Sequence, residues 1–157
     1  MIKQFENKIY AGVLGKLLGV YLGRPVEGWS YEKIRDTFDE VKYYVHDKVG
    51  VPLIVADDDI SGTFGFFRAI EDNEYDRNLS AEAFGDTWLN YIIENKTILW
   101  WGGLGRSTEH TAFLNLKKGI NAPESGSMKV NGRTLSEQIG AQIFIDAIAM
   151  ACPDNPD

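Results

Sequence analysis

The stretch "LIVADDDISGTFGFFRAI", residues 53–70, predicts a helix that begins at a cluster of acidic side chains. After the cluster, apolar side chains recur at Phe64, Phe67 and Ile70, a spacing typical of one face of an α-helix. The three aspartates precede this face, where the positive end of the helix dipole favours carboxylates. The apolar run at 51–55 indicates that they are partly buried. Because adjacent like charges repel, something must balance them.

Helical spacing also dominates the rest of the chain, so we expect an all-α fold. We predict a compact orthogonal helical bundle with long functional loops, forming the N-terminal part of a larger all-α domain. Ser30 and Ser80 are placed to cap helix N-termini. The expected helices cover residues 4–22, 30–41, a segment after Ser80, 111–118 and 135–151, and the expected loops cover 43–56, 98–110 and 121–132.

No internal repeat or interdomain linker divides the sequence, so we predict a single domain over residues 1–157. The last residues, "ACPDNPD" at 151–157, close one helix and then supply the start signals of another. This pattern predicts that the chain is the front portion of a longer protein. A core exposed at such an end would favour a homodimer.

Composition restricts the classes of partner. Hydrophobic residues make up 44% and charged residues 25%, and the formal net charge is -7. An acidic chain has no basic surplus with which to neutralise phosphates, which argues against nucleic acid and anionic membranes. The apolar segment at 9–23 contains Lys16 and is shorter than the roughly 20 residues that span a bilayer.

Cysteine and histidine content also narrows the possibilities. Cys152 is the only cysteine, so no intrachain disulfide can form, and a lone thiol fits a reducing cytoplasm. With only His46 and His110 besides, a structural zinc site is not expected. The N-terminus lacks the apolar core of a signal peptide. We therefore predict a cytoplasmic protein.

Two interpretations remain open for Asp57, Asp58 and Asp59. In the first, one aspartate caps the helix and the others are solvated. In the second, the three carboxylates bind a hard cation, because Mg²⁺ and Ca²⁺ take oxygen ligands. Partial burial favours the second interpretation.

A second candidate is Glu27, in the turn "GRPVEGW" at 23–29. It is either a surface carboxylate or a positioned general acid or base, which could also orient a metal-bound water.

Two glycine-bearing stretches could bind substrate. "WWGGLGRSTEHT" at 100–111 supplies the backbone of Gly103 and Gly105 and the side chains of Ser107 and His110, or it is a plain connection. It is not a dinucleotide fingerprint, because its spacing is wrong and no βαβ unit surrounds it. "SGSMKVNG" at 125–132 could hold a phosphate through amides, Ser125 or Ser127, or it is a simple turn.

Taken together and in this order, the motifs resemble the ADP-ribosylglycohydrolase family. "AGVLGKLLGVYLGRPVEGW" at 11–29 is similar to the family's glycine-rich first helix, which ends in a glutamate turn. "ADDDISGTF" at 56–64 is similar to its Thr-Asp-Asp metal motif, and "EQIGAQIFIDAIAMACPDNP" at 137–156 is similar to a later helix. The resemblance spans nearly the whole chain.

The resemblance implies an all-α hydrolase with a binuclear Mg²⁺ centre. The expected substrate is an ADP-ribose-like small molecule or an ADP-ribosylated partner, whose glycosidic bond is cleaved. By position, Asp57 and Asp58 would bind metal, with Asp59 beside them, and Asp58 would also be catalytic. Glu27 would lie by the scissile bond.

Departures from the family pattern leave alternatives. Ala56 replaces the family's threonine, Asp59 replaces a usual hydroxyl residue, and the second metal motif, an Asp-x-Asp, has no counterpart in this sequence. The chain could therefore be a catalytically inactive or truncated ligand-binding module of the same fold. It could also be a magnesium-dependent hydrolase of a different nucleoside-like or sugar substrate.

Overall fold

Helices form all the regular secondary structure in the part of the chain that the structure describes, which confirms the all-α prediction. The computed structural model describes residues 2–76, 78–94, 96–97 and 105–153. Its helices are α1 (Ile2–Gly23), the 3₁₀ helix η1 (Arg24–Val26), α2 (Tyr31–Phe38), α3 (His46–Val49), α4 (Asp58–Asp72), α5 (Ala81–Tyr91), α6 (Thr108–Lys117), the 3₁₀ helix η2 (Glu124–Gly126), α7 (Met128–Asn131), α8 (Arg133–Ser136), α9 (Gly140–Phe144) and α10 (Asp146–Ala151).

Contacts between residues divide the chain into two compact units. We call residues 1–55 the N-terminal unit and residues 56–157 the C-terminal unit. None of the helices described here is both long enough and apolar enough to cross a membrane.

The N-terminal unit contains α1, η1, α2 and α3. Ser30 caps α2 as predicted, because its hydroxyl accepts a hydrogen bond from the Lys33 backbone N–H at 3.2 Å. The Tyr21 hydroxyl on α1 donates to the Val55 carbonyl at 3.3 Å, which ties the end of the unit back to its first helix. The loop predicted for residues 43–56 is wrong in part, since it contains α3, which ends at Gly50 in a left-handed conformation.

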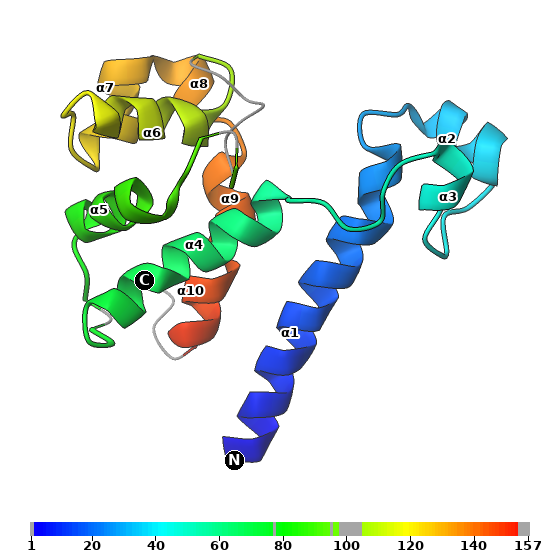
Figure 1. Ribbon diagram of the computed structural model, residues 1–157, viewed down its shortest axis with the longest axis horizontal. Coiled ribbons are helices and arrows are strands. Elements are labelled where there is room, and N and C mark those ends of the chain that lie inside the picture. Colours follow the sequence, from blue (N-terminus) through cyan, green and yellow to red (C-terminus); the bar gives the residue numbers. More distant parts are fainter. Residues whose placement is uncertain (1, 77, 95, 98–104, 154–157) are drawn as a thin grey trace. The chain divides into compact units, whose positions relative to one another are not determined.

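The C-terminal unit is organised around α4, which contacts α5, α9 and α10 (Figure 1). Its core consists of Trp88, Ile92, Phe113 and Leu116 from α5, its C-cap and α6. The Phe66 ring of α4 packs on this core, with its centroid 4.4 Å from that of Trp88. The aromatic side of α4 therefore holds the unit together.

The single helix predicted for 135–151 is wrong, because this segment forms α8, α9 and α10. The Thr63 hydroxyl of α4 donates a hydrogen bond to the carbonyl of Ile143 at 3.1 Å. In a continuous helix this carbonyl would accept a hydrogen bond from a backbone N–H of the next turn. Thr63 is 1% exposed. This contact with α4 therefore lies at the end of α9, where a single helix over 135–151 would have continued.

Substituting alanine at two glycines of α4 should change stability in opposite directions. A Cβ at Gly62 would lie 2.5 Å from Cε1 of Phe144, so this ring, which is 2% exposed, would have to shift. We expect Gly62→Ala to destabilise the protein by about 1–3 kcal/mol. The matched control Gly65→Ala meets no atom within 4 Å and should stabilise the helix by up to about 1 kcal/mol. Denaturant unfolding of both variants tests this, and an equal effect at the two sites would contradict it.

Candidate functional site

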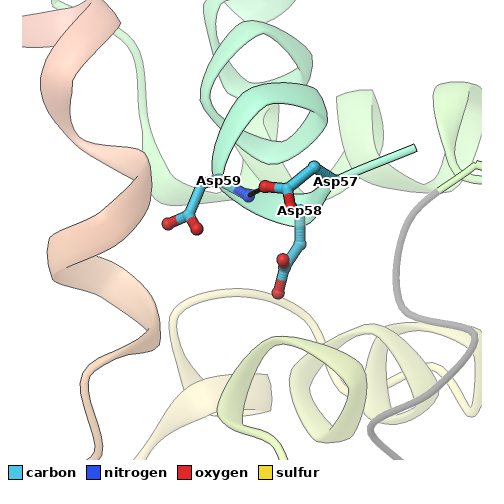
Figure 2. Close-up of side chains that lie close together, drawn as sticks. All are labelled: Asp57, Asp58 and Asp59. Carbon is cyan, nitrogen blue, oxygen red and sulfur yellow. Dashed lines mark hydrogen bonds between the residues drawn. The ribbon is translucent and has the colours of Figure 1, made fainter. Parts of the chain in front are cut away.

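The first turn of α4 carries the three adjacent aspartates (Figure 2). Asp57 is the N-cap, in an extended backbone conformation, and its Oδ1 accepts a hydrogen bond from the Asp59 backbone N–H at 3.1 Å. Asp58 and Asp59 follow as the first helical residues. The predicted cap is therefore Asp57, and the exposed amides of the helix N-terminus partly offset the negative charge.

The three carboxylates lie close together at the start of α4. One oxygen from each lies within 4.8 Å of the others. Asp57 is buried, at 5% exposure, and Asp58 and Asp59 are half-buried. Three oxygen ligands at this spacing form a donor set that suits Mg²⁺ or Ca²⁺. The cap at Asp57 is present, and cation binding by the three carboxylates stays a prediction.

The electrostatic cost of the cluster falls mainly on Asp58. Burial raises the pKa of its carboxyl to about 6, from an ordinary value of 3.8. A hydrogen bond from its own backbone lowers the pKa, whereas the negative charges of Asp57, Asp59 and Glu109 raise it further. A bound cation would remove this penalty, because it favours the ionised form.

Glu109 is a residue near this cluster that the sequence did not single out. It lies in the first turn of α6, where its Oε2 accepts a hydrogen bond from the Thr108 hydroxyl at 2.8 Å. Gly140, the first residue of α9, packs so closely on Thr108 that a Cβ there would overlap the hydroxyl oxygen. In the sequence, Glu109 stands out only as part of the pattern "STEH". Its position near Asp58 depends on the fold, which brings α6 close to the start of α4.

A small hollow lies beside Glu109 in the C-terminal unit. Its volume is about 170 Å³, and its lining includes Thr108, Glu109, Ser136, Gln138, Phe66 and Phe144. The hydroxyl oxygen of Ser136 is buried and has no hydrogen-bond partner among the described residues. A polar group left in this state is an energetic cost of packing in this part of the unit.

The glycine-rich stretch before α6 uses its polar groups locally. Gly103 lies outside the described residues. The Gly105 N–H donates to the Thr111 hydroxyl at 2.8 Å, and Ser107 caps α6 by accepting from the His110 N–H at 3.1 Å. His110 Nε2 lies 3.7 Å from a Glu94 carboxylate oxygen. These groups hold the start of α6 in place, and their predicted contact with substrate stays a prediction.

Ser125 and Ser127 also have structural partners. The buried Asn115 amide donates to the Ser125 carbonyl at 2.9 Å and to Asn131 Oδ1 at 2.8 Å. Ser127 caps α7 by accepting from the Val130 N–H at 3.3 Å. The segment is thus fixed to α6 through side-chain amides, and phosphate binding there stays a prediction.

Glu27 belongs to the N-terminal unit. It follows η1, and its N–H donates to the Arg24 carbonyl at 3.2 Å. The side chain is exposed and borders a hollow of about 560 Å³ that is also lined by Arg24, Pro52 and Val55. Glu27 is therefore accessible to a ligand, as a general acid or base must be.

Replacing Asp58 by asparagine should stabilise the metal-free protein near neutral pH. The unfolded chain loses the Asp58 proton around pH 3.8, whereas the folded chain keeps it to about pH 6. The free energy of unfolding therefore falls as pH rises between these values. The neutral Asp58→Asn side chain avoids this loss, which amounts to about 1 kcal/mol for a half-exposed, partly screened group. Denaturant unfolding in EDTA measures the effect, and a gain as large at about pH 4 as at about pH 7 would contradict it.

Comparison with known proteins identifies the family. The sequence model described as ADP-ribosylglycohydrolase matches residues 1–157. Searches of curated proteins and of solved structures returned no significant match. The family agrees with the all-α fold of the described residues. The chain belongs to the ADP-ribosylglycohydrolase family.

Proposed function

We propose that the protein is a magnesium-dependent hydrolase that cleaves a glycosidic bond to ADP-ribose or a related nucleoside or sugar. The observation that carries the proposal is the convergence of three carboxylate oxygens within 4.8 Å at the start of α4. Membership of the family supports the reaction class. The nature of the donors supports the metal, since Mg²⁺ is bound in proteins through carboxylates and waters.

Asp57, Asp58 and Asp59 would hold the metal in this proposal. Mg²⁺, when bound, supplies a Lewis acid that polarises the attacking water and orients the ribose hydroxyls. Asp57 is fixed by burial and by its cap hydrogen bond, so it is the most rigid of the three. Asp58 is the member with the raised pKa, and its carboxyl can also hold a proton close to neutral pH.

Glu27 would act as the general base or acid of the reaction. Its exposed carboxylate stands at the mouth of a hollow and can exchange a proton with water or with the leaving group. The backbone hydrogen bond to Arg24 fixes the turn that carries it.

The hollow beside Glu109 would hold part of the substrate. At about 170 Å³ it is smaller than the roughly 300–1,000 Å³ that accommodates a complete small-molecule ligand, so a single sugar ring is the appropriate size. Glu109 would hydrogen-bond the ring hydroxyls. Phe66 and Phe144 would contact its apolar face.

A second candidate function is ligand binding without catalysis. Ala56 offers no hydroxyl where the family's metal motif has threonine, which favours a weakened metal site. Calorimetry with ADP-ribose and Mg²⁺ separates the two functions, because a non-catalytic module would bind ADP-ribose and release none from a modified protein.

Mg²⁺ should stabilise the wild-type protein and not the Asp58→Asn variant. A ligand that binds only the folded state raises the melting temperature, and the asparagine removes one of three charged ligands. Thermal unfolding with millimolar Mg²⁺ against EDTA measures the shift. Asp86→Asn, at an exposed position on α5, is the matched control and should keep the full shift. An unchanged shift in Asp58→Asn would contradict metal binding at the cluster.

Glu27→Gln should abolish Mg²⁺-dependent release of ADP-ribose from an ADP-ribosylated protein. Loss of a general base or acid lowers kcat by about 10²–10⁴-fold, while the amide keeps the shape of the side chain. Glu32→Gln, at an exposed carboxylate on α2, should retain activity. Equal turnover by Glu27→Gln and wild type would exclude this role for Glu27.

A further inference from the structure

Thr108 and Glu109 are neighbours in the first turn of α6, and both line the hollow of about 170 Å³. Both residues are half-buried, so each has surface left for contact with a ligand. The Thr108 hydroxyl donates a hydrogen bond to Oε2 of Glu109 at 2.8 Å. A carboxylate can accept about four hydrogen bonds, so Glu109 keeps the capacity to accept others from a ligand.

This hydrogen bond bears on how well Glu109 can bind. A glutamate side chain has several rotatable bonds, and a ligand that must order it loses part of the binding free energy to conformational entropy. A partner that already holds one carboxylate oxygen reduces that loss. The Thr108 hydroxyl is such a partner.

The first residue of α9 restricts the same pair from another side. Gly140 is buried, and its backbone packs on both side chains. A Cβ there would overlap the Thr108 hydroxyl oxygen and would lie 2.7 Å from Oε2 of Glu109. The absence of a Cβ therefore permits the contact, and the close approach leaves the hydrogen-bonded pair little room to rotate.

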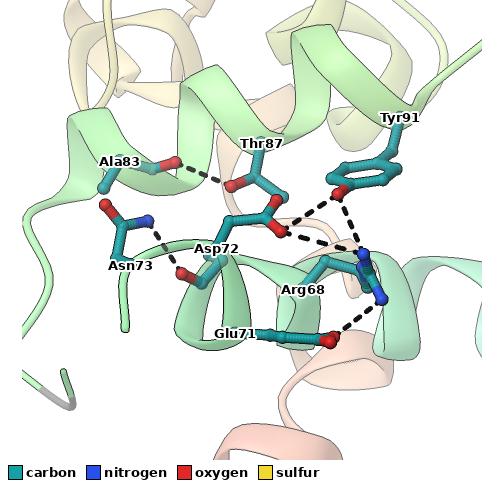
Figure 3. Close-up of polar contacts among 8 residues, drawn as sticks. Arg68, Glu71, Asp72, Asn73, Ala83, Thr87 and Tyr91 are labelled. Carbon is teal, nitrogen blue, oxygen red and sulfur yellow. Dashed lines mark hydrogen bonds and ion pairs between the residues drawn. The ribbon is translucent and has the colours of Figure 1, made fainter. Parts of the chain in front are cut away.

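The apolar wall of the hollow includes Phe66 of α4 and Trp88 of α5, with ring centroids 4.4 Å apart. Figure 3 shows the polar contacts that connect these two helices on their exposed side: Nη2 of Arg68 donates to the Tyr91 hydroxyl at 3.0 Å, and this hydroxyl donates to Asp72 at 3.0 Å. The wall thus belongs to a connected pair of helices. A ring in the hollow would lie against a fixed surface.

We propose that Thr108 is a positioning residue, which orients the Glu109 carboxylate toward the hydroxyl groups of a sugar ring in the hollow. The Thr108 hydroxyl proton is directed to Glu109, so its effect on the ligand acts through that carboxylate. The inference rests on the proposed binding of a sugar ring beside Glu109. It involves no bond cleavage, so binding alone tests it.

Calorimetry with ADP-ribose and Mg²⁺ tests the proposal through two variants that differ only in a hydroxyl group. Thr108→Ser keeps the donor and should bind ADP-ribose with the affinity of the wild type. Thr108→Ala lacks the donor and should bind about three- to tenfold more weakly, the effect of one hydrogen bond. Thr37→Ala removes a hydroxyl that donates to the Lys33 carbonyl in α2, and this matched control should leave binding unchanged.

A Glu109→Ala background separates positioning from a general effect on packing. There, Thr108→Ala should weaken binding no further, because the carboxylate that the hydroxyl orients is gone. Equal losses in the two backgrounds, equal affinities of Thr108→Ala and Thr108→Ser, or no saturable binding of ADP-ribose by the wild type would each overturn the proposal. The expected affinities without release of ADP-ribose from a modified protein would support the positioning role and contradict the hydrolase activity.

Discussion

The site depends on one constraint. Three carboxylates must lie close together at the start of α4, with one oxygen of each within 4.8 Å of the others. The protein meets part of it through the backbone, since Asp57 caps the helix and accepts the Asp59 N–H. The helix dipole offsets a further part, by about 0.3–1 kcal/mol for each exposed charge. Burial, more than the neighbouring charges, raises the pKa of Asp58 to about 6. In the metal-free protein this raised pKa makes the ionised form of Asp58 less favourable than in the unfolded chain.

The rest of the C-terminal unit fixes α4 so that this cluster cannot relax. Gly62 permits the Phe144 ring of α9 to lie directly on the helix backbone. The next residue of α4, Thr63, donates a hydrogen bond from its hydroxyl to the carbonyl of Ile143 in α9. At the first residue of α9, Gly140 packs on Thr108 of α6, next to Glu109. Gly62 and Gly140 therefore allow α9 to pack closely against both α4 and α6, the helices that carry the aspartate cluster and Glu109.

Polar residues of the C-terminal unit divide into two classes by their partners. Ser107, Ser127 and Asn115 satisfy backbone groups and stabilise helix ends or turns. By contrast, the Ser136 hydroxyl and the Trp88 indole N–H are buried without partners among the described residues. Burial without a hydrogen bond is unfavourable, so these two groups reduce the stability that the packing provides.

The sequence by itself determined the helical class, the caps at Ser30 and Ser80, and the acidic start of α4. These features are local, because spacing and capping act within a few residues of the chain. The sequence also pointed to the family through motifs that carry the expected chemistry.

Only the tertiary structure decided the division of 135–151 into three helices, the position of Glu109 near Asp58, and the hollow beside Glu109. Each of these depends on contacts between segments far apart in sequence, such as Thr63 with Ile143, which no local pattern encodes. The physical reason is that close packing, not propensity, fixes where a helix ends once another element supplies its hydrogen-bond partners.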